Sequence, residues 1–410
     1  MPTTTRPLRT LVALAAGSLA LAAVLPAAAS AASTTSGAQL PPVNPAALRQ
    51  SIAGLPDQGI TAALVSVSGS GGSWRGASGT ADLATGRAAS PDMRFRIGSV
   101  TKVFTAVVVL QLAAEHRVDL DTPVQHYLPG VLPADFPPIT VAELLDHTSG
   151  LPGGTTDDGE DDPATFVRER FGHPTPAQVV AEMAGQPMTF APGTQQQYNG
   201  ENYYLLGMLV EKVTGRSYAT EVTDRVLRPL RLRDTEVPAA TDYRVGGRHL
   251  HGYLDVTENG VTTPADVTEQ SPYPWAEGGM ISSARDLRTV LTAAMDGRLL
   301  PAAQREDLFT APDVPYHDAT HCQLGNPGRA CFSMGLMSAT IDGVTVWGKT
   351  GSRPGYTDGV FATRDLSRVL VYAFTPTSDS DPYTAFIQGI AQAALAGTNP
   401  SAAGQRPSAG

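Results

Sequence analysis

The pattern of apolar and polar positions predicts strands near both ends of the chain. Residues Ile60–Ser68 alternate and are rich in β-branched side chains, which is typical of a strand, and Trp74–Thr80 predicts a second strand. Three further strand-like runs follow near the C-terminus: Phe332–Ile341, Val344–Lys349 and Val360–Phe374, the last with a turn at Arg364–Asp365. We therefore expect the two ends of the chain to meet in one antiparallel sheet.

The middle of the chain predicts mainly helices. Residues Val103–Ala114 are apolar on all sides, which indicates a helix buried on most of its faces. The other predicted helices are Ile139–His147, Pro176–Met183, Tyr203–Thr214, Tyr218–Val226, Ser282–Asp296 and the amphipathic Pro382–Leu395. Together the elements predict an α/β (α+β) fold, in which a five-stranded antiparallel sheet is flanked by helices and carries an inserted all-helical subdomain. A cleft at their junction is the expected site.

The start of the buried helix carries a serine three residues before a lysine, in Ile97-Gly98-Ser99-Val100-Thr101-Lys102. Residues i and i+3 of a helix are neighbours, so Ser99 and Lys102 should lie side by side. A buried amine resists being charged, so its pKa falls and it can accept a proton. The N–H groups at a helix start favour negative charge nearby. The motif thus predicts a serine nucleophile with a lysine base; the alternative is a chance pattern on a core helix.

Composition makes that lysine more informative. The chain has 29 Lys and Arg residues, of which three are lysines: Lys102, Lys212 and Lys349. Arginine keeps its proton whereas lysine can release it, so a lysine at position 102 favours a catalytic role as a base. The net charge is −10 without a basic block, which argues against nucleic acid and against an anionic membrane surface as partners.

The N-terminus predicts a secretory signal peptide over residues 1–31. Arg6 and Arg9 precede the apolar run Leu11–Leu25, and Ala29-Ser30-Ala31 fits a cleavage site. The apolar run is short and no later run is long enough to span a bilayer, so we expect a secreted protein; retention as an anchor is the alternative. The rest of the chain divides into a flexible leader (32–45), a folded catalytic domain (46–397) and a disordered tail (398–410).

Two cysteines, Cys322 and Cys331, lie in a loop that contains Gly and Pro. In an exported protein they favour a disulfide that staples this loop and contributes on the order of 2–3 kcal/mol. Two free buried thiols are the alternative.

Metal and cofactor sites are not expected. The pairs His249/His251 and His317/His321 lack a suitably spaced acidic or cysteine partner. We see no Gly-x-Ser-x-Gly, His-Glu-x-x-His, phosphate-loop or dinucleotide motif. The acidic loop Gly154–Asp162 lacks calcium-ligand spacing, so it should be a solvated surface loop. His147 could be catalytic, but a histidine at a helix end more often fixes a loop.

Two later segments complete a set of motifs. They are Gln197–Tyr203 (QYNGENY) and Trp347–Tyr356 (WGKTGSRPGY), the second placing a lysine and hydroxyls at a strand end. With Ser-x-x-Lys, in this order and spacing, they resemble the serine penicillin-recognising enzymes. The resemblance is closest to the branch of class C β-lactamases and secreted serine D-Ala-D-Ala carboxypeptidases. It covers residues 46 to 397 and includes RFRIGSVTK, LLDHTSGLP, YYLLGMLVEKVTG, GGMISSARDL and GKTGSRPGY.

The resemblance implies a role for each motif residue and a β-lactamase/DD-peptidase fold. Ser99 would be the acylated nucleophile, and Lys102 and Tyr198 would shuttle protons. Tyr198 would need nearby cations such as Lys102 and Lys349 to act as a phenolate, because the reference pKa of tyrosine is about 10. Substrate-binding residues on the opposite wall would be Lys349, Thr350, Gly351 and Ser352, and the N–H groups of Ser99 and Ser352 would form an oxyanion hole.

One position departs from the family pattern. The family usually has Tyr-x-Asn, whose Asn contacts the amide side chain of the substrate. This chain has Tyr198-Asn199-Gly200, so the resemblance places Gly200 at that substrate-binding position; Asn199 should point elsewhere, and Asn202 is a candidate substitute. Lys349 and Arg353 are candidates for binding a substrate carboxylate. We expect a monomeric D-Ala-D-Ala carboxypeptidase that acts on cell-wall peptides without metal or cofactor. The alternatives are a β-lactamase, an esterase or D-amino-acid amidase, and a penicillin- or cell-wall-binding module without turnover.

Overall fold

The computed structural model describes residues 40–57, 59–153, 162–317, 321–322, 326–378 and 383–398; at 321–322 and 326–327 only the backbone is described. Several predictions therefore lie outside the described residues: the signal peptide at 1–31, most of the leader at 32–45, most of the acidic loop at 154–162 and nearly all of the tail at 398–410. Cys331 is buried, but the side chain of Cys322 is not described, so the disulfide remains a prediction.

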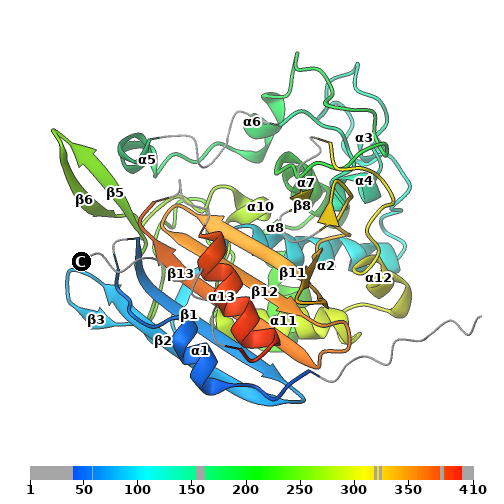
Figure 1. The fold of residues 1–410 in the computed structure, drawn as a ribbon. Helices are drawn as coiled ribbons and strands as arrows, with labels where there is room; N and C mark the ends of the chain where they lie inside the picture. The colour runs from blue at the N-terminus through cyan, green and yellow to red at the C-terminus, as the bar shows by residue number, and fades with distance from the viewer. Residues whose placement is uncertain are drawn as a thin grey trace, which may run out of the picture. The chain divides into compact units, whose positions relative to one another are not determined.

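Within the described residues, a seven-stranded antiparallel sheet in the order β10-β11-β12-β13-β1-β2-β3 forms the centre of the fold (Figure 1). Its strands are β1 (Ile60–Gly69), β2 (Gly72–Asp82), β3 (Arg87–Ala88), β10 (Met337–Ile341), β11 (Val344–Arg353), β12 (Tyr356–Ala362) and β13 (Arg368–Pro376). Strand β1 pairs with β13, from Ala63 opposite Phe374 to Gly69 opposite Arg368. The two ends of the chain therefore close the sheet, as predicted.

The predicted count of five strands was too small. The apolar run Val360–Phe374 supplies two strands, because the turn at Arg364–Asp365 separates the end of β12 from β13. The short strand β3 adds an edge beyond β2, and β10 starts only at Met337 instead of Phe332. The fold class is unchanged by these differences.

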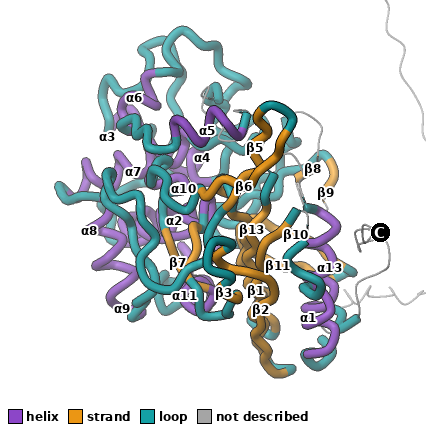
Figure 2. Tube along the Cα trace, turned by 90° about the vertical axis from the view of Figure 1, so that its left-hand side faces the viewer, coloured by secondary structure: helices purple, strands orange, loops and turns teal. Residues whose placement is uncertain are grey.

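The sheet separates two apolar cores, as the alternation along β1 shows. Ala63 and Val65 pack with the helices α1 (Pro45–Ser51) and α13 (Thr384–Leu395), whereas Leu64 belongs to the larger core on the opposite face. That second face is covered by α11 (Ala284–Met295), against which α2 (Thr101–Ala114) packs. Figures 1 and 2 show α1 and α13 on one side of the sheet and α2 and α11 on the other.

The segment between β3 and β10 is mainly helical but not all-helical, which corrects the prediction. Its helices are α2, α3 (Val124–Tyr127), α4 (Val141–Leu145), α5 (Pro163–Glu169), α6 (Pro176–Ala181), α7 (Glu201–Thr214), α8 (Tyr218–Val222), a π-helical segment η2 (Thr223–Leu227), α9 (Arg228–Leu230), α10 (Trp275–Gly278), α11 and α12 (Ala302–Asp307). Three short strand pairs accompany them: β4 (Arg94–Arg96) with β7 (Ile281–Ser283), β5 (Tyr253–Glu258) with β6 (Val261–Asp266), and β8 (His321–Cys322) with β9 (Asn326–Pro327).

The missed hairpin of β5 and β6 has a simple cause. Asn259 and Gly260 connect its strands with φ angles of 53° and 78°. Two consecutive positive φ angles are what a tight two-residue hairpin requires, and Asn-Gly is the sequence that supplies them most easily. The dipeptide stands in the sequence, but the residues of β6 are almost all exposed and give no strand-like alternation.

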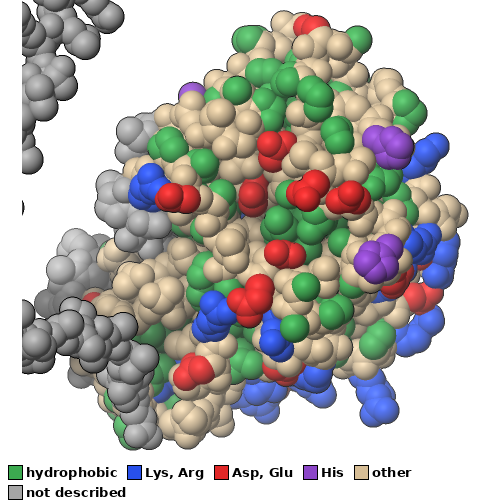
Figure 3. Space-filling view, turned by 90° about the vertical axis from the view of Figure 1, so that its right-hand side faces the viewer, with side chains coloured by type: hydrophobic (Ala, Val, Ile, Leu, Met, Phe, Trp, Pro, Cys, Tyr) green, Lys and Arg blue, Asp and Glu red, His purple; other side chains and the backbone are tan. Residues whose placement is uncertain are grey.

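Helix α2 is buried on nearly all sides, which confirms the prediction from its apolar run. The 3₁₀ turn η1 (Gly98–Val100) precedes it, so Ser99 lies in the turn and Lys102 in the first turn of the helix. None of the helices in the described ranges is long and apolar enough to cross a membrane. On the face shown in Figure 3, acidic and basic side chains are interspersed with uncharged ones.

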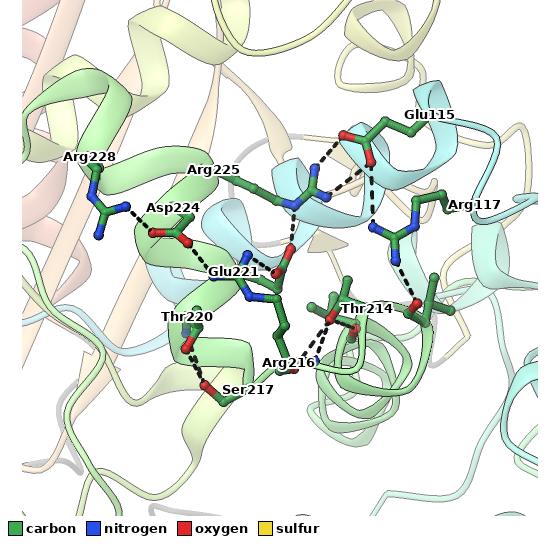
Figure 4. A network of polar contacts seen from close by, with 12 residues as sticks. Glu115, Arg117, Thr214, Arg216, Ser217, Thr220, Glu221, Asp224, Arg225 and Arg228 are labelled. Carbon is green, nitrogen blue, oxygen red and sulfur yellow. Dashed lines mark hydrogen bonds and ion pairs between the residues drawn. The ribbon is translucent and has the colours of Figure 1, made fainter.

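An ion-pair network ties the C-terminal end of α2 to α8 and η2 (Figure 4). Arg225 donates to Glu221 at 2.6 Å and to Glu115, directly after α2, at 2.5 and 3.1 Å. Arg216 adds contacts to Glu221, at 3.0 Å, and to Asp224. Glu221 is 2% exposed, so its charge depends on these arginines and not on water.

Replacing Arg225 by Met should lower the free energy of unfolding by about 1–3 kcal/mol, because buried Glu221 loses one of its two arginine partners. Calorimetric melting should show the loss as a fall in Tm of several degrees. Arg244→Met is the matched control, because Arg244 pairs with Asp242 on the surface and should change stability by less than about 0.5 kcal/mol. Equal effects of the two variants would contradict a stabilising role for the network.

Candidate active site

The structure brings the three predicted catalytic side chains together at the start of α2. The Tyr198 hydroxyl donates to Ser99 Oγ at 2.7 Å, and Lys102 Nζ donates to the same oxygen at 3.1 Å. Lys102 is fully buried, whereas Ser99 and Tyr198 both border a cleft. The Ser99 oxygen thus faces two proton-carrying groups on one side and open space on the other.

Tyr198 is held by the loop that leads into α7. Its N–H donates to the Tyr316 hydroxyl at 3.1 Å. Gln196, two residues before Tyr198, is fully buried and acts as an anchor. Its amide nitrogen donates to the carbonyls of Asp146 and Phe332, at 2.7 and 2.9 Å, and its oxygen accepts from the Cys331 and Phe332 N–H groups. The position of Tyr198 is therefore fixed by contacts to segments far away in the sequence.

His147 supports the Tyr198 ring and does not act on Ser99. The two ring centroids are 4.6 Å apart, and Nδ1 of His147 accepts from the Asn199 N–H at 3.3 Å. Burial, and next to it the charges of Lys102 and Lys349, lower the pKa of His147 well below its usual value. A neutral histidine packed behind the tyrosine fits the structural interpretation made from the sequence.

Neither asparagine near the departing motif reaches Ser99. The Asn199 amide donates to the carbonyls of Leu151 and Pro152, at 2.9 and 3.2 Å, so it points away as expected. Asn202 is fully buried between Ser149 and His147 and cannot substitute for a substrate-contacting residue.

A carboxylate that the sequence analysis missed lies beside Lys102. Glu277, in α10, forms an ion pair with Lys102 Nζ through Oε1, and its backbone carbonyl accepts from the same nitrogen at 3.0 Å. Its Oε1 also lies 3.5 Å from Ser99 Oγ. Glu277 immediately precedes Gly278-Gly279, where the segment GGMISSARDL begins. No spacing rule connects Glu277 with Lys102.

The opposite wall is the end of β11, which holds the predicted residues Lys349, Thr350, Gly351 and Ser352. Two glycines allow it to approach η1 closely. A Cβ on Gly98 would lie 2.2 Å from the Ser352 carbonyl oxygen, and one on Gly351 would lie 2.1 Å from that of Ile97. Any larger residue at either position would separate the strand from the turn that carries Ser99.

Two cations flank the Tyr198 ring, as the phenolate hypothesis requires. Lys102 Nζ and Lys349 Nζ lie 4.9 and 4.8 Å from its centroid. Burial, and secondly the charge of Lys102, lower the pKa of Lys349 to about 7, although Glu277 and Asp358 act in the opposite direction. Lys349 therefore gains or loses its charge near neutral pH.

Ser99 and Tyr198 open into a cleft of about 380 Å³ that is lined largely by aromatic residues and hydroxyls. Its aromatic lining comprises Tyr198, Tyr316, Phe332, Tyr372 and Tyr383. Of the described residues that line the cleft, Lys349 alone is basic. Arg353, the other candidate for a substrate carboxylate, is 5% exposed and donates instead to Gln270 and to the Ser271 carbonyl, at 3.0 and 3.4 Å.

Of the two histidine pairs in the sequence, His249 and His251 line a different pocket, whereas the side chain of His321 in the other pair lies outside the described part of the structure. The rings of His249 and His251 stack at 4.9 Å, and His251 Nδ1 lies 2.8 Å from Asp266. Among the residues that the structure describes, no group of three or more His, Cys, Asp or Glu side chains could hold a metal ion.

A family model described as "Beta-lactamase" matches residues 48–393, which include every element of the site. The chain belongs to the β-lactamase family. It is therefore a serine hydrolase of the group that contains β-lactamases and penicillin-binding proteins, and the motif resemblance is confirmed.

The proteins to which this chain is similar carry names that point to different activities. A D-stereospecific amidohydrolase from a Streptomyces species superposes with a TM-score of 0.73 at 33% identity, over 87% of this chain and 99% of that one. Esterase EstB of Burkholderia gladioli is 30% identical over 298 residues, 66% of this chain and 72% of EstB. Penicillin-binding protein 4 of Amycolatopsis lactamdurans is 36% identical over 180 residues, which cover 42% of this chain and 44% of that protein. The chain therefore matches less than half of that protein's length.

Replacing Lys349 by Met should stabilise this β-lactamase-family chain at neutral pH. The unfolded state binds a proton at Lys349 up to about pH 10.5, whereas the folded state releases it near pH 7, so burying this lysine costs stability. That cost is full below pH 7 and disappears as the pH rises toward 10.5. Chemical denaturation should thus show a gain in unfolding free energy at pH 7 that shrinks by pH 10. Lys212→Met, on the exposed face of α7, should show neither effect, and a pH-independent result for Lys349→Met would contradict the pKa shift.

Proposed function

We propose that this chain hydrolyses amides or esters of D-amino acids through an acyl-enzyme on Ser99. The observation that carries the proposal is the convergence of the Tyr198 hydroxyl and Lys102 Nζ on Ser99 Oγ, in a cleft lined by aromatic residues and hydroxyls. A serine hydroxyl needs such neighbours, because it is a weak nucleophile until a base takes its proton.

The acylation step follows from this geometry. Ser99 Oγ attacks the substrate carbonyl carbon while its proton passes to the Lys102–Tyr198 group. The carbonyl oxygen becomes negative and would be bound by the N–H groups of Ser99 and Ser352, which the two close-packed glycines bring together. When the carbonyl re-forms, the bond to the leaving nitrogen or oxygen breaks, and Tyr198 donates the proton that the leaving group needs.

Deacylation uses the same groups in reverse. Water enters the cleft, Tyr198 takes its proton, and the resulting hydroxide attacks the ester carbon. The bond to Ser99 Oγ then breaks and the serine recovers its proton. Lys102 and Lys349, near the Tyr198 ring, would favour the phenolate that both steps use.

The substrate class follows from what the cleft offers. Its aromatic lining suits an apolar or aromatic side chain, and its single described cation, Lys349, is largely uncharged above pH 7. Arg353 is engaged inside the protein, so the cleft has little to hold a terminal carboxylate. The similarity to a D-stereospecific amidohydrolase and to an esterase supports amides and esters as substrates.

D-alanyl-D-alanine carboxypeptidase activity is the second candidate. It is supported by the similarity to a penicillin-binding protein and by Lys349, whose ammonium form below pH 7 could bind a substrate carboxylate. This activity should therefore favour mildly acidic pH. The predicted signal peptide would place either activity outside the cytoplasm, where cell-wall peptides are also found.

A substrate panel separates these functions. We expect the purified protein to hydrolyse D-phenylalanine amide and methyl ester at least about tenfold faster than the L-enantiomers and than a diacyl-Lys-D-Ala-D-Ala peptide, with D-alanine release as the peptidase readout. Ser99→Ala should abolish every activity, because no other group can form the acyl-enzyme. Preferred hydrolysis of the peptide would favour the carboxypeptidase, and consumption of benzylpenicillin a β-lactamase. Activity retained by Ser99→Ala would contradict the mechanism.

A further inference from the structure

The contacts of Lys102 show a proton acceptor that the proposed mechanism has not used. Its Nζ donates to Ser99 Oγ, to the Glu277 backbone carbonyl and to the Glu277 carboxylate. These three acceptors match the three N–H bonds of an ammonium group. A lysine in this state cannot take a proton from Ser99 until it gives one away, and Glu277 Oε1 is in direct contact with it.

The protein is built to keep Glu277 in this place. Helix α10 packs between α2 and α7, where a Cβ on Gly207 would lie 2.6 Å from the Trp275 ring and 2.7 Å from the Ala276 side chain. Thr105 of α2 donates to the Ala276 carbonyl at 2.8 Å. The Glu277 side chain is only 12% exposed, so water screens its interaction with Lys102 weakly.

Gly200 provides independent evidence, because its backbone does not require glycine. Its φ and ψ angles of −68° and −37° are ordinary helical values that any residue adopts. A Cβ at this position would lie 3.3 Å from both Cγ and Oε1 of Glu277, which is tighter than normal packing. Glycine at 200 therefore leaves the space that the Glu277 side chain occupies beside Lys102.

We propose that Glu277 and Lys102 act as one proton-accepting pair, and that Gly200 is the residue that admits Glu277 to it. The inference rests on the proposed acylation of Ser99 and adds the final acceptor of its proton. Glu277 acts through Lys102 and does not contact the substrate in this account.

The protons balance over one acylation. Lys102 ammonium gives a proton to the Glu277 carboxylate, and the resulting amine takes the Ser99 proton as Oγ bonds to the carbonyl carbon. On collapse Tyr198 protonates the leaving group and is reprotonated by Lys102. Glu277 then returns its proton to Lys102, which restores the ion pair.

Several other titratable groups lie near the Lys102–Glu277 pair, and their titration must be distinguished from that of the pair. Those that face it are Tyr198, Tyr203, His147, Lys349 and, behind Lys349, Asp358. Burial raises the pKa of Tyr203 well above its usual value and lowers that of His147, so both stay neutral. Lys349, with a pKa of about 7, and Asp358, whose pKa burial raises well above its usual value, are the groups to control. The charge of Glu277 raises the pKa of Lys349. Removing Glu277 would therefore move the Lys349 titration to lower pH.

The test is the pH dependence of Ser99 labelling by a fluorophosphonate, followed by intact mass and needing no knowledge of the substrate. In wild type the pair can pass the Ser99 proton on to the Glu277 carboxylate, so labelling should persist further into the acid range than in a variant without this carboxylate. In Glu277→Gln, Lys102 must first lose a proton to water. We expect labelling to fall about 10²-fold at pH 6 and to recover at pH 9, which moves the acid limb to higher pH. Glu211→Gln, at a carboxylate that caps Tyr218, should match wild type.

Each other outcome overturns the proposal. A shift of the acid limb to lower pH would mean that Glu277 only stabilises the Lys102 charge. If Glu277→Gln lost the same fraction of labelling at every pH, Glu277 would position Lys102 without accepting a proton. If the pH profile of labelling were unchanged, Glu277 would have no role in the reaction. Failure of the proposed function is distinguishable, because it would leave Ser99 labelled normally but without turnover of any acyl substrate. If wild-type Ser99 does not react at all, both fail.

A second pair of variants tests the role of Gly200 without removing the carboxylate. Gly200→Asn should displace Glu277 from Lys102 and produce the same shift of the acid limb to higher pH, with a melting temperature near that of wild type. Gly153→Asn is the control, because a Cβ there meets nothing within 4 Å. A normal labelling profile for Gly200→Asn would contradict the assigned role of this glycine.

Discussion

The burial of a lysine amine directly against the nucleophile is the constraint on which this site depends. Lys102 is fully enclosed in a helix that is apolar on all sides, and a charge in such a place must be paired. The structure meets this need with Glu277, with the oxygen of Ser99 and with the ring of Tyr198. The contacts that compensate the charge of this buried lysine also hold its amine in position for proton transfer.

The fold serves this constraint by bringing three distant segments together. Helix α2 supplies Ser99 and Lys102, the loop before α7 supplies Tyr198, and the end of β11 supplies Lys349 and the backbone opposite Ser99. Glycines at 98 and 351 let the sheet approach the serine turn, while Gly207 lets α10 approach α7. Close backbone packing, more than any single hydrogen bond, thus determines where the reactive groups meet.

Local patterns in the sequence predicted the parts of the site that local spacing determines. Ser99 and Lys102 are three residues apart on one helix, and Lys349 to Ser352 are consecutive on a strand, so their proximity needs no tertiary information. The apolar run of α2 was predictable for the same reason, whereas the meeting of β1 with β13 followed from the strand-like runs at both ends of the chain. Glu277 was missed because its partner is 175 residues away in the sequence and the contact depends on how α10 packs between two helices. The all-helical subdomain was wrong because the segment also contains the β5–β6 hairpin, joined at Asn259-Gly260. Strand β6 is almost entirely exposed, so it has no alternation of buried apolar and exposed polar positions.

The central claim is that Ser99 carries the acyl group, and it is tested most directly by trapping that intermediate. The protein is mixed with an activated ester, quenched in acid within milliseconds and analysed by intact mass and peptide mapping. The account predicts one acyl group per chain, on the peptide that contains Ser99, formed in a burst before steady turnover. Turnover without a covalent adduct, or an adduct on another residue, would contradict it.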